Sequence, residues 1–336
     1  MANTVGTSPY DIELFGGAID DVFLGVTDAP TWARGLAGRD IITTGAGDDR
    51  LEGNGGDDIL FSGAGVDRIF GGFGNDVIDA GDGNDLISAG IGDDTVVGGW
   101  GDDRIWGDGG NDSISGDAGN DIIEAGDGND FVRGGVGNDV LFGGDGNDRL
   151  NGDGGHDDMF GELGNDSLFG GSGNDVMNGG EGNDYINGGA DDDILNGGLG
   201  DDVLAGINGD DILIANGGTD ILTGGTGMDS FVFESGHATI TDFQMFEDRI
   251  VIDGDELDGS RFALDTDGNL LRYSTPETPD ADLSPIAVVV GTATVVSGSF
   301  QFTSLDGDTL KVSGVTDEDL GLSTLFVLPP DDINIY

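Results

Sequence analysis

Aspartate and apolar positions recur along most of the chain with a step of nine residues. An aspartate stands at every ninth position from Asp40 to Asp229, which gives 22 aspartates without an insertion. The residue two places after each aspartate is always apolar, from Ile42 to Phe231. Because side chains alternate between the faces of a strand, this residue should point inward and its neighbours outward. The pattern predicts a strand of three residues in each repeat and a turn of about six residues between strands.

Glycines mark the turns of this repeat. The residue two places before the aspartate is glycine in 21 of the 22 repeats, and Asp191 is the exception. The most regular units read GGxGND, any residue, apolar, any residue, as in Gly134–Phe142 (GGVGNDVLF). Glycine allows a positive φ in a turn and a close approach of stacked turns. If two units make one turn, residues 35–232 form 11 turns, with a length of roughly 50 Å at ~4.8 Å per turn.

The charge of the chain creates a folding problem. The 336 residues include 67 acidic and 11 basic side chains, for a net charge of −56, and 68 residues are glycine. A compact body with this charge repels itself, although 36% of the residues are hydrophobic and need burial. A cation that neutralises the acids during folding would solve the problem. Carboxylates are hard oxygen ligands, and they preferentially bind hard cations such as calcium or magnesium.

Composition also excludes several classes of site. The chain has no cysteine and only two histidines, His156 and His237, which excludes disulfides, thiolate metal sites and a zincin motif. The acidic balance argues against nucleic-acid binding. The longest aliphatic run, Ile286–Val290, is too short for a transmembrane segment.

The array resembles the RTX (repeats-in-toxin) family, whose hemolysin-type repeat is a calcium-binding β-helix signature. The resemblance implies an all-β fold, a right-handed parallel β-roll with a β-rich C-terminal cap. It also implies that the repeat aspartates and turn carbonyls coordinate Ca²⁺ between successive turns, since calcium accepts this oxygen set more readily than magnesium. The calcium ligands that the resemblance implies are Asp49, Asp58, Asp67, Asp76, Asp85, Asp94, Asp103, Asp112, Asp121, Asp130, Asp139, Asp148, Asp157, Asp166, Asp175, Asp184, Asp193, Asp202, Asp211 and Asp220.

Ten gaps on each side of the roll would hold about 20 Ca²⁺ ions. These ions would change the net charge from −56 to about −16. Weak sites are predicted near Asp193, where Asp191 replaces a turn glycine, and at the ends of the array, around Asp40 and Asp220. The alternative is that the aspartates are only turn residues or a solvated acidic face.

The chain divides by composition into three parts. Residues 1–34 are interpreted as an N-terminal cap with one decayed repeat, Gly16–Leu24 (GGAIDDVFL), residues 35–232 as the roll and residues 233–336 as a C-terminal β-rich cap. Alternating stretches predict strands at Ser230–Phe233, Ala238–Phe243, Arg249–Ile252, Ile286–Val290, Ser299–Phe302, Thr309–Val312 and Thr324–Val327, with a proline-rich loop at Thr275–Pro285.

Two C-terminal stretches carry a further resemblance. Asp229–Asp253 is similar to the cap of serralysin-type proteins, and Gly307–Leu320 is similar to the region that the type I secretion apparatus recognises. The resemblance implies a secreted, extracellular protein without a Sec signal, which folds where calcium is plentiful. The alternative is a folded cap without a role in secretion.

The sequence does not favour an enzyme. The 34 residues before the array are too few for a catalytic domain, and no Gly-x-Ser-x-Gly motif is present. His156 is interpreted as a turn variant and His237 as structural. The segment Asp265–Asn269 (DTDGN) begins like a calcium loop but is interpreted as a turn.

Alternate repeats should place arginines beside aromatic residues on one face, namely Arg50, Arg68 and Arg104 with Phe70, Trp106, Phe142 and Phe160. This mixture suits sugar stacking, an anionic polymer or self-association. The alternative is ordinary cross-strand packing.

The leading hypothesis is therefore a secreted, non-catalytic calcium-binding protein that serves as a structural or binding module. Acidic polysaccharide and the cell surface are candidate partners. One alternative is a polysaccharide-binding accessory module, similar to the repeat modules of alginate epimerases. A membrane-active protein is another, although no strongly amphipathic segment supports it.

Overall fold

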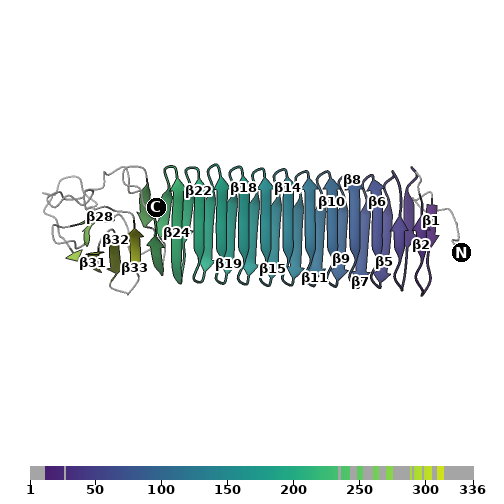
Figure 1. Cartoon of the computed structure of the whole chain (residues 1–336), viewed down its shortest axis with the longest axis horizontal. Helices are drawn as coiled ribbons and strands as arrows, with labels where there is room; N and C mark the ends of the chain where they lie inside the picture. The colour runs from purple at the N-terminus through teal and green to yellow at the C-terminus, as the bar shows by residue number, and fades with distance from the viewer. Residues whose placement is uncertain are drawn as a thin grey trace. The chain divides into compact units, whose positions relative to one another are not determined.

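The repeats form parallel β-strands that stack in two sheets, as a computed structural model shows (Figure 1). Each strand pairs with the strand two places further along the chain, so that Arg50 lies opposite Arg68, and Arg68 opposite Leu86. The interval of 18 residues means that two nonapeptides make one turn. The prediction of an all-β parallel solenoid built from these repeats is confirmed.

The structure describes most of the repeat array in full and the C-terminal part by its strand backbones. The fully described residues are 12–25, 28–233, 236–242 and 248. Beyond them it describes the backbone of the strands at 249–252, 260–264, 270–274, 288–289, 291–296, 299–304 and 309–313. The chain divides into two compact units, Met1–Gly180 and Glu181–Tyr336.

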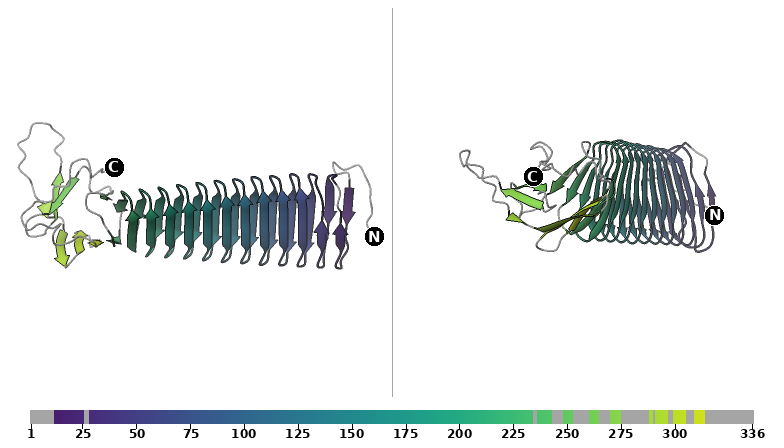
Figure 2. Two further views of the ribbon diagram at one scale, coloured as in Figure 1. Left: turned by 45° about the horizontal axis from the view of Figure 1, so that its top comes forward. Right: turned by 60° about the vertical axis from the view of Figure 1, so that its left-hand side comes forward.

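In the first unit, odd-numbered strands form one sheet, here named sheet A, and even-numbered strands form sheet B (Figure 2). Sheet A contains β1 (Ile12–Phe15), β3 (Thr31–Arg34), β5 (Arg50–Gly55), β7 (Arg68–Phe73), β9 (Leu86–Ile91), β11 (Arg104–Gly109), β13 (Ile122–Asp127), β15 (Val140–Asp145) and β17 (Asp158–Leu163). Sheet B contains β2 (Val22–Leu24), β4 (Ile41–Thr43), β6 (Ile59–Ala64), β8 (Val77–Asp82), β10 (Thr95–Trp100), β12 (Ser113–Ala118), β14 (Phe131–Val136), β16 (Arg149–Gly154) and β18 (Ser167–Ser172). β19 (Val176–Glu181) ends just past the boundary between the units.

The second unit continues the same alternation and then changes to antiparallel pairing. Its strands are β20 (Tyr185–Ala190), β21 (Ile194–Leu199), β22 (Val203–Asn208), β23 (Ile212–Ala215), β24 (Thr219–Thr226), β25 (Ser230–Phe233), β26 (His237–Ile240), β27 (Arg249–Ile252), β28 (Ser260–Leu264), β29 (Leu270–Ser274), β30 (Val288–Val289), β31 (Gly291–Val296), β32 (Ser299–Ser304) and β33 (Thr309–Ser313). β33 pairs in parallel with β26, whereas β31, β32 and β33 pair antiparallel.

The strands are longer than the sequence pattern predicts. Most strands of the first unit have six residues instead of three. The ladder continues through the start of the next repeat, where Gly72 pairs with Gly90 and Phe73 with Ile91. The glycine-rich half of each expected turn is therefore strand backbone, and only about three residues remain to reverse the chain.

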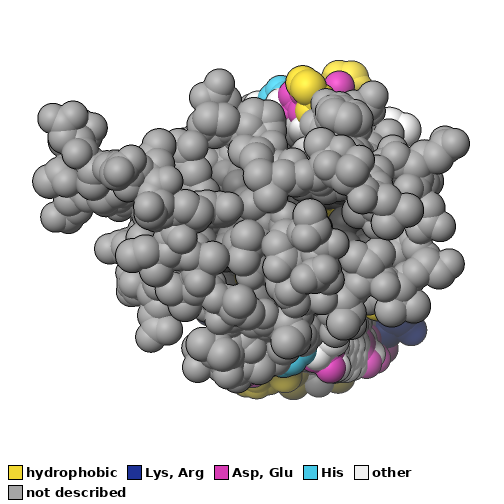
Figure 3. All heavy atoms as spheres, turned by 90° about the vertical axis from the view of Figure 1, so that its left-hand side faces the viewer, with side chains coloured by type: hydrophobic (Ala, Val, Ile, Leu, Met, Phe, Trp, Pro, Cys, Tyr) yellow, Lys and Arg dark blue, Asp and Glu magenta, His cyan; other side chains and the backbone are white. Residues whose placement is uncertain are grey.

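The core is a single column of apolar side chains from each sheet. The residue two places after each repeat aspartate is at most 1% exposed from Ile42 to Phe231, which confirms the predicted inward orientation. Outside the core, the described surface visible in Figure 3 mixes hydrophobic and acidic side chains. Across the part of the chain that the structure describes, no helix is long and apolar enough to span a membrane.

Several predictions concern segments before and after the array. β1 and β3 extend sheet A before residue 35, because Leu14 pairs with Ala33 and Ala33 with Leu51. Six of the seven predicted C-terminal strands overlap β25, β26, β27, β30, β32 and β33. Thr324–Val327 and the loop Thr275–Pro285 lie outside the described residues, as does the Asp265–Asn269 segment between antiparallel strands β28 and β29.

Candidate metal sites along the turns

The repeat aspartates are buried at the two edges where the chain reverses. Edge 1 denotes the turns from an odd strand to the next even strand, such as the turn with Asp58. Edge 2 denotes the turns from an even to an odd strand, such as the turn with Asp67. All 20 predicted ligands, together with Asp40 and Asp229, are at most 3% exposed. A solvated acidic face is therefore wrong for these residues.

Within each unit the aspartates of one edge form a hydrogen-bonded ladder. The Asp58 backbone N–H donates to Asp76 Oδ1 at 2.7 Å, and the Asp67 N–H donates to Asp85 Oδ1 at 2.7 Å. In the second unit the Asp202 N–H reaches Asp220 Oδ1 at 3.1 Å. The Asp58 carbonyl accepts the Val77 N–H at 2.8 Å. The main chain of each rung is thus satisfied.

The second carboxylate oxygen of these rungs accepts no hydrogen bond within the described residues, although it is buried. This holds for Oδ2 of Asp40, Asp49, Asp58, Asp67, Asp76, Asp85, Asp94, Asp103, Asp112, Asp121, Asp130, Asp139, Asp148, Asp157, Asp202, Asp211, Asp220 and Asp229. A buried polar atom without a partner is costly and points to an ion or water at that place.

The Oδ2 atoms without a hydrogen bond lie beside the first residue of the turn, five places before the aspartate. The space beside this residue is here named the cradle. A Cβ atom added to Gly71 would stand 2.4 Å from Asp76 Oδ2 and 2.3 Å from the carbonyl oxygen of Ala89 in the next turn. The same point at Gly53 lies 2.4 Å from Asp58 Oδ2 and 2.6 Å from the Gly71 carbonyl oxygen. The first glycine thus leaves the Oδ2 atom and a carbonyl oxygen of the next turn facing the same space beside the backbone. Carboxylate and carbonyl oxygens together are a ligand set that calcium accepts.

Further turn carbonyls point toward the following turn. A Cβ on Gly74 would meet the Gly56 carbonyl oxygen at 2.1 Å, and Gly74 has a positive φ of 118°. Glycine is required there because both the backbone conformation and the close approach exclude a side chain. In the described residues no three His, Cys, Asp or Glu side chains meet in one metal-binding group. The donor set is instead one of carboxylates with backbone carbonyls.

The raised pKa values of the ladder aspartates favour a positive charge beside them. Burial raises the pKa of Asp67, Asp76 and Asp103 to about 7, and the charges of neighbouring ladder aspartates add to this effect. Burial likewise raises the pKa of Asp58 and Asp85 to about 6. The hydrogen bond from the preceding rung acts in the opposite direction in each case. Ionised carboxylates are therefore unfavourable here without a cation.

The structure adds rungs beyond the 22 aspartates of the nine-residue register. The Thr31 N–H donates to Asp49 Oδ1 at 2.6 Å, and the Asp21 N–H donates to Asp40 Oδ1 at 2.7 Å. At the other end the Asp229 N–H donates to Asp248 Oδ1 at 3.1 Å. The GGAIDD segment signalled the Asp21 rung. Thr31 is in register with the repeat aspartates but is not an aspartate, whereas Asp248 lies one place out of register.

Asp191, the residue that replaces a turn glycine, keeps the glycine conformation with a φ of 76°. Its carbonyl oxygen lies 2.0 Å from the point where a Cβ on Gly209 would stand, as in the glycine turns. The turn geometry is therefore preserved at the cost of left-handed strain. A weaker site near Asp193 stays a prediction.

The two histidines have structural contacts. His156 lies in an exposed ladder of asparagine side chains on edge 2, where its N–H donates to Asn138 Oδ1 at 2.9 Å. Its own Nδ1 accepts the Asn174 N–H at 2.8 Å. The His237 main chain pairs with Thr219 between β26 and β24.

One family model describes four consecutive copies of the RTX calcium-binding nonapeptide repeat. This model matches the chain at residues 34–69, 61–96, 97–132, 133–168, 169–204 and 205–240. Together these matches cover residues 34–240, more than half of the chain. No curated protein matches the chain significantly.

Proposed function

Because this chain belongs to the family of proteins with RTX calcium-binding nonapeptide repeats, we propose that it is a non-catalytic module whose solenoid folds on loading with many Ca²⁺ ions outside the cell. The observation that carries the proposal is the double ladder of buried Asp Oδ2 atoms, several of which share the space beside a first glycine with a carbonyl oxygen of the next turn. Calcium would supply the positive charge that these oxygens need. The aspartates would hold the ions, and the turn glycines would leave room for them.

Calcium-dependent folding is the direct test. Far-UV circular dichroism of the full chain should show a β-rich spectrum in millimolar Ca²⁺, since extracellular calcium modules bind at ~10⁻⁴–10⁻³ M. In EDTA the spectrum should become that of an unfolded chain, because uncompensated buried carboxylates oppose the fold. Equal millimolar Mg²⁺ serves as the control and should restore much less structure. An identical spectrum in EDTA and in calcium would contradict the proposal.

Export by the type I apparatus forms part of this proposal. Its support is that RTX repeat proteins are typically secreted and that calcium-coupled folding suits a chain that crosses membranes unfolded. A host with a type I transporter should release the full chain, and a chain without residues 307–336 should stay inside. Equal release of both chains would argue against the route.

A second candidate function is binding of acidic polysaccharide, and the outer face of sheet A favours it. This surface, named the arginine–aromatic face, is defined by Trp32, Arg34, Arg50, Arg68, Phe70, Arg104 and Trp106 on strands β3 to β11. Four of the ten arginines of the chain lie here, and the acidic side chains of the same strands are Glu52 on β5 and Asp108 on β11. The face is therefore locally cationic in a strongly acidic protein.

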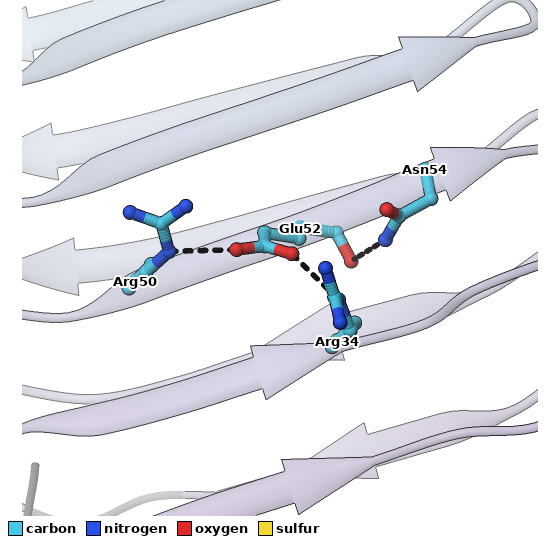
Figure 4. Close-up of polar contacts among 4 residues, drawn as sticks. All are labelled: Arg34, Arg50, Glu52 and Asn54. Carbon is cyan, nitrogen blue, oxygen red and sulfur yellow. Dashed lines mark hydrogen bonds and ion pairs between the residues drawn. The ribbon is translucent and has the colours of Figure 1, made fainter. Parts of the chain in front are cut away.

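Contacts on this face hold the arginines in place. Arg34 Nε and Arg50 Nε each donate to Glu52 at 2.7 Å (Figure 4). Burial of Glu52 alone would raise its pKa, but Arg50 and Arg34 outweigh it and hold that pKa below the ordinary value. The guanidinium of Arg50 lies 4.9 Å from the Phe70 ring centroid. The terminal nitrogens thus stay available for a ligand carboxylate.

Sequence reasoning placed three arginines and four aromatic residues on one face, and all seven belong to strands of sheet A: Arg50, Arg68, Arg104, Phe70, Trp106, Phe142 and Phe160. Phe142 and Phe160 stack at 5.0 Å with an interplanar angle of 12°, and Arg104 lies 5.9 Å from the Trp106 ring. Cross-strand packing is therefore present as well. Half-buried rings still offer apolar surface on which a sugar can pack, beside cations that pair with uronate groups.

Retention on an immobilised polyuronate tests this second function. The calcium-loaded chain should be retained, and an Arg68→Gln, Arg104→Gln double variant should elute at lower salt. Arg133→Gln is the matched control, because Arg133 lies on sheet B and pairs with Asp153. Equal elution of all three proteins would reject the arginine–aromatic face as the binding site.

A further inference from the structure

The first residue of each turn, five places before the ladder aspartate, lies beside the cradle. This residue is glycine in 16 of the 22 repeats. The six exceptions are Thr44, Ser62 and Ala80, in successive turns of edge 2, and Ala89, Ala125 and Ala215, at separate places on edge 1. The first glycines, such as Gly53, Gly71 and Gly98, have no left-handed φ. The backbone therefore accepts a side chain at this position, and only the use of the space differs.

Two of the exceptions fill the cradle with a hydroxyl. Thr44 Oγ1 donates to the Ser62 carbonyl oxygen at 2.9 Å, and Ser62 Oγ donates to the Ala80 carbonyl oxygen at 2.7 Å. Both side chains are buried, with 5% and 0% exposure. These hydrogen bonds run from one turn to the next and engage the carbonyls that face the cradle in glycine turns.

A glycine turn of the same edge shows the contrast. At Gly98 no side chain stands at the first position, and a Cβ there would lie 2.4 Å from Asp103 Oδ2 and 3.0 Å from the Gly116 carbonyl oxygen. These two oxygens are therefore open to a cation, which accepts carboxylate and carbonyl oxygens together. A hydroxyl at the first position donates to the corresponding carbonyl oxygen and thus competes with the ion for that ligand.

We propose that the two gaps after Thr44 and Ser62 do not bind calcium, and that these hydroxyls join the first turns of edge 2 by protein hydrogen bonds instead. The inference rests on the proposed calcium loading of the glycine turns. It removes two ions from the count of about 20 gaps, those between Asp49 and Asp67 and between Asp67 and Asp85. The start of edge 2 thereby becomes a segment whose order does not depend on the metal.

The test exchanges the first residue in both directions and counts ions. Ser62→Gly should bind one more Ca²⁺ per chain than the parent in equilibrium dialysis of the full chain, because it opens a cradle. Ser62→Thr is the matched control, since it keeps a hydroxyl at the position that Thr44 occupies in the preceding turn, and its count should equal that of the parent. Gly116→Ser should lose one ion, because it closes a cradle on the same edge.

The outcomes separate this inference from the proposed function. An unchanged calcium count in Ser62→Gly, with circular dichroism equal to that of the calcium-loaded parent, would overturn the inference and leave the proposed function intact. A parent chain that binds no calcium would instead refute the proposed function. If Gly116→Ser does not fold, Ser62→Gly against Ser62→Thr still decides, because glycine adds no bulk and threonine already stands at the equivalent position 44.

Discussion

The first turns of edge 2 and the later turns of the same edge share one ladder of aspartates but are joined by different contacts. Thr44 and Ser62 hydroxyls connect the first turns through 2.9 Å and 2.7 Å hydrogen bonds to backbone carbonyls. From Gly98 onward the corresponding space holds no side chain, and the Asp103 and Asp121 Oδ2 atoms are buried without a hydrogen bond from the described residues. In the first turns the chain itself supplies the group that contacts the carbonyl oxygen. In the later turns an ion or water from solution would have to contact the corresponding oxygens.

This difference shows that a repeat protein can be stabilised by side-chain hydrogen bonds in some turns and by a bound ligand in others. A hydroxyl provides one proton to one carbonyl and leaves the carboxylate charge in place. A divalent cation neutralises charge and gathers several oxygens at once. Glycine turns therefore gain more from the ion but depend on it, whereas the hydroxyl turns gain less and keep their contact at any calcium concentration.

Removal of calcium should have the largest effect, and it should unfold the later turns of edge 2 more than the first turns. In EDTA at pH 7, amide hydrogen exchange of residues 98–157 should approach that of an unfolded chain, while residues 44–67 should keep measurable protection. The reason is that only the second segment has hydroxyl hydrogen bonds from the first turn position to the next turn. Mass spectrometry of proteolytic peptides measures both segments in one sample. Uniform exchange across them would remove the distinction.

Acid should replace calcium in the glycine turns. The ladder pKa values lie at about 7 for Asp103 and about 6 for Asp121, above the ordinary value of 3.8, because burial disfavours the charged form. A raised pKa in the fold means that bound protons stabilise it fully below about pH 4, and this stability is lost as the pH rises through 6 to 7.

In chelator, the β-rich circular dichroism signal should therefore appear on acidification from pH 8 to pH 5 and disappear again when the pH is returned. A protonated Oδ2 could donate to the facing carbonyl, as the Ser62 hydroxyl does. A calcium-saturated sample is the control and should show little change in this range. A chelated chain that stays unfolded at pH 5 would contradict the pKa argument.

Substitution of single rungs should distinguish the two regions by ion count. Asp103→Asn removes a carboxylate from a glycine turn and should lower the number of bound Ca²⁺ ions by at least one. Asp49→Asn removes a carboxylate beside Thr44 and should leave the count unchanged. Asparagine keeps the Oδ1 acceptor of the ladder, so both variants retain the rung contact. Equilibrium dialysis gives the counts, and equal losses would show that both regions bind metal alike.

The smallest effect should come from the hydroxyl itself. Thr44→Val keeps the branched shape and removes the donor to the Ser62 carbonyl. Loss of one buried hydrogen bond should lower the free energy of unfolding by about 0.5–1.5 kcal/mol, with calcium present. Urea denaturation compares the variant with the parent. Thr43→Val is the control, because Thr43 lies on the outer face of β4 and is not among the first residues of a turn. An equal loss in both variants would assign the effect to β4 as a whole.

Sequence reasoning found the main elements of the site for an identifiable reason. Every rung of the solenoid has the same environment, so one residue type recurs at each equivalent place, and the register of Asp58, Asp76 and Asp94 is visible in the sequence. The inward apolar column follows from the same register. The long strands were missed because glycine-rich segments normally indicate turns, while here the parallel ladder extends through them.

The sequence by itself determined the nine-residue register, the inward apolar positions, the recurring aspartates and the acidic excess that favours a cation, because these follow from periodicity and charge. Only the tertiary structure decided which oxygens are orphaned, that Asp21 and Asp248 extend the ladders, and that Thr44 and Ser62 enter the cradle. These features depend on which atoms of neighbouring turns face one another. Residues 18 apart meet only after the chain has closed each turn, and a linear pattern does not record the direction of a carbonyl or a hydroxyl.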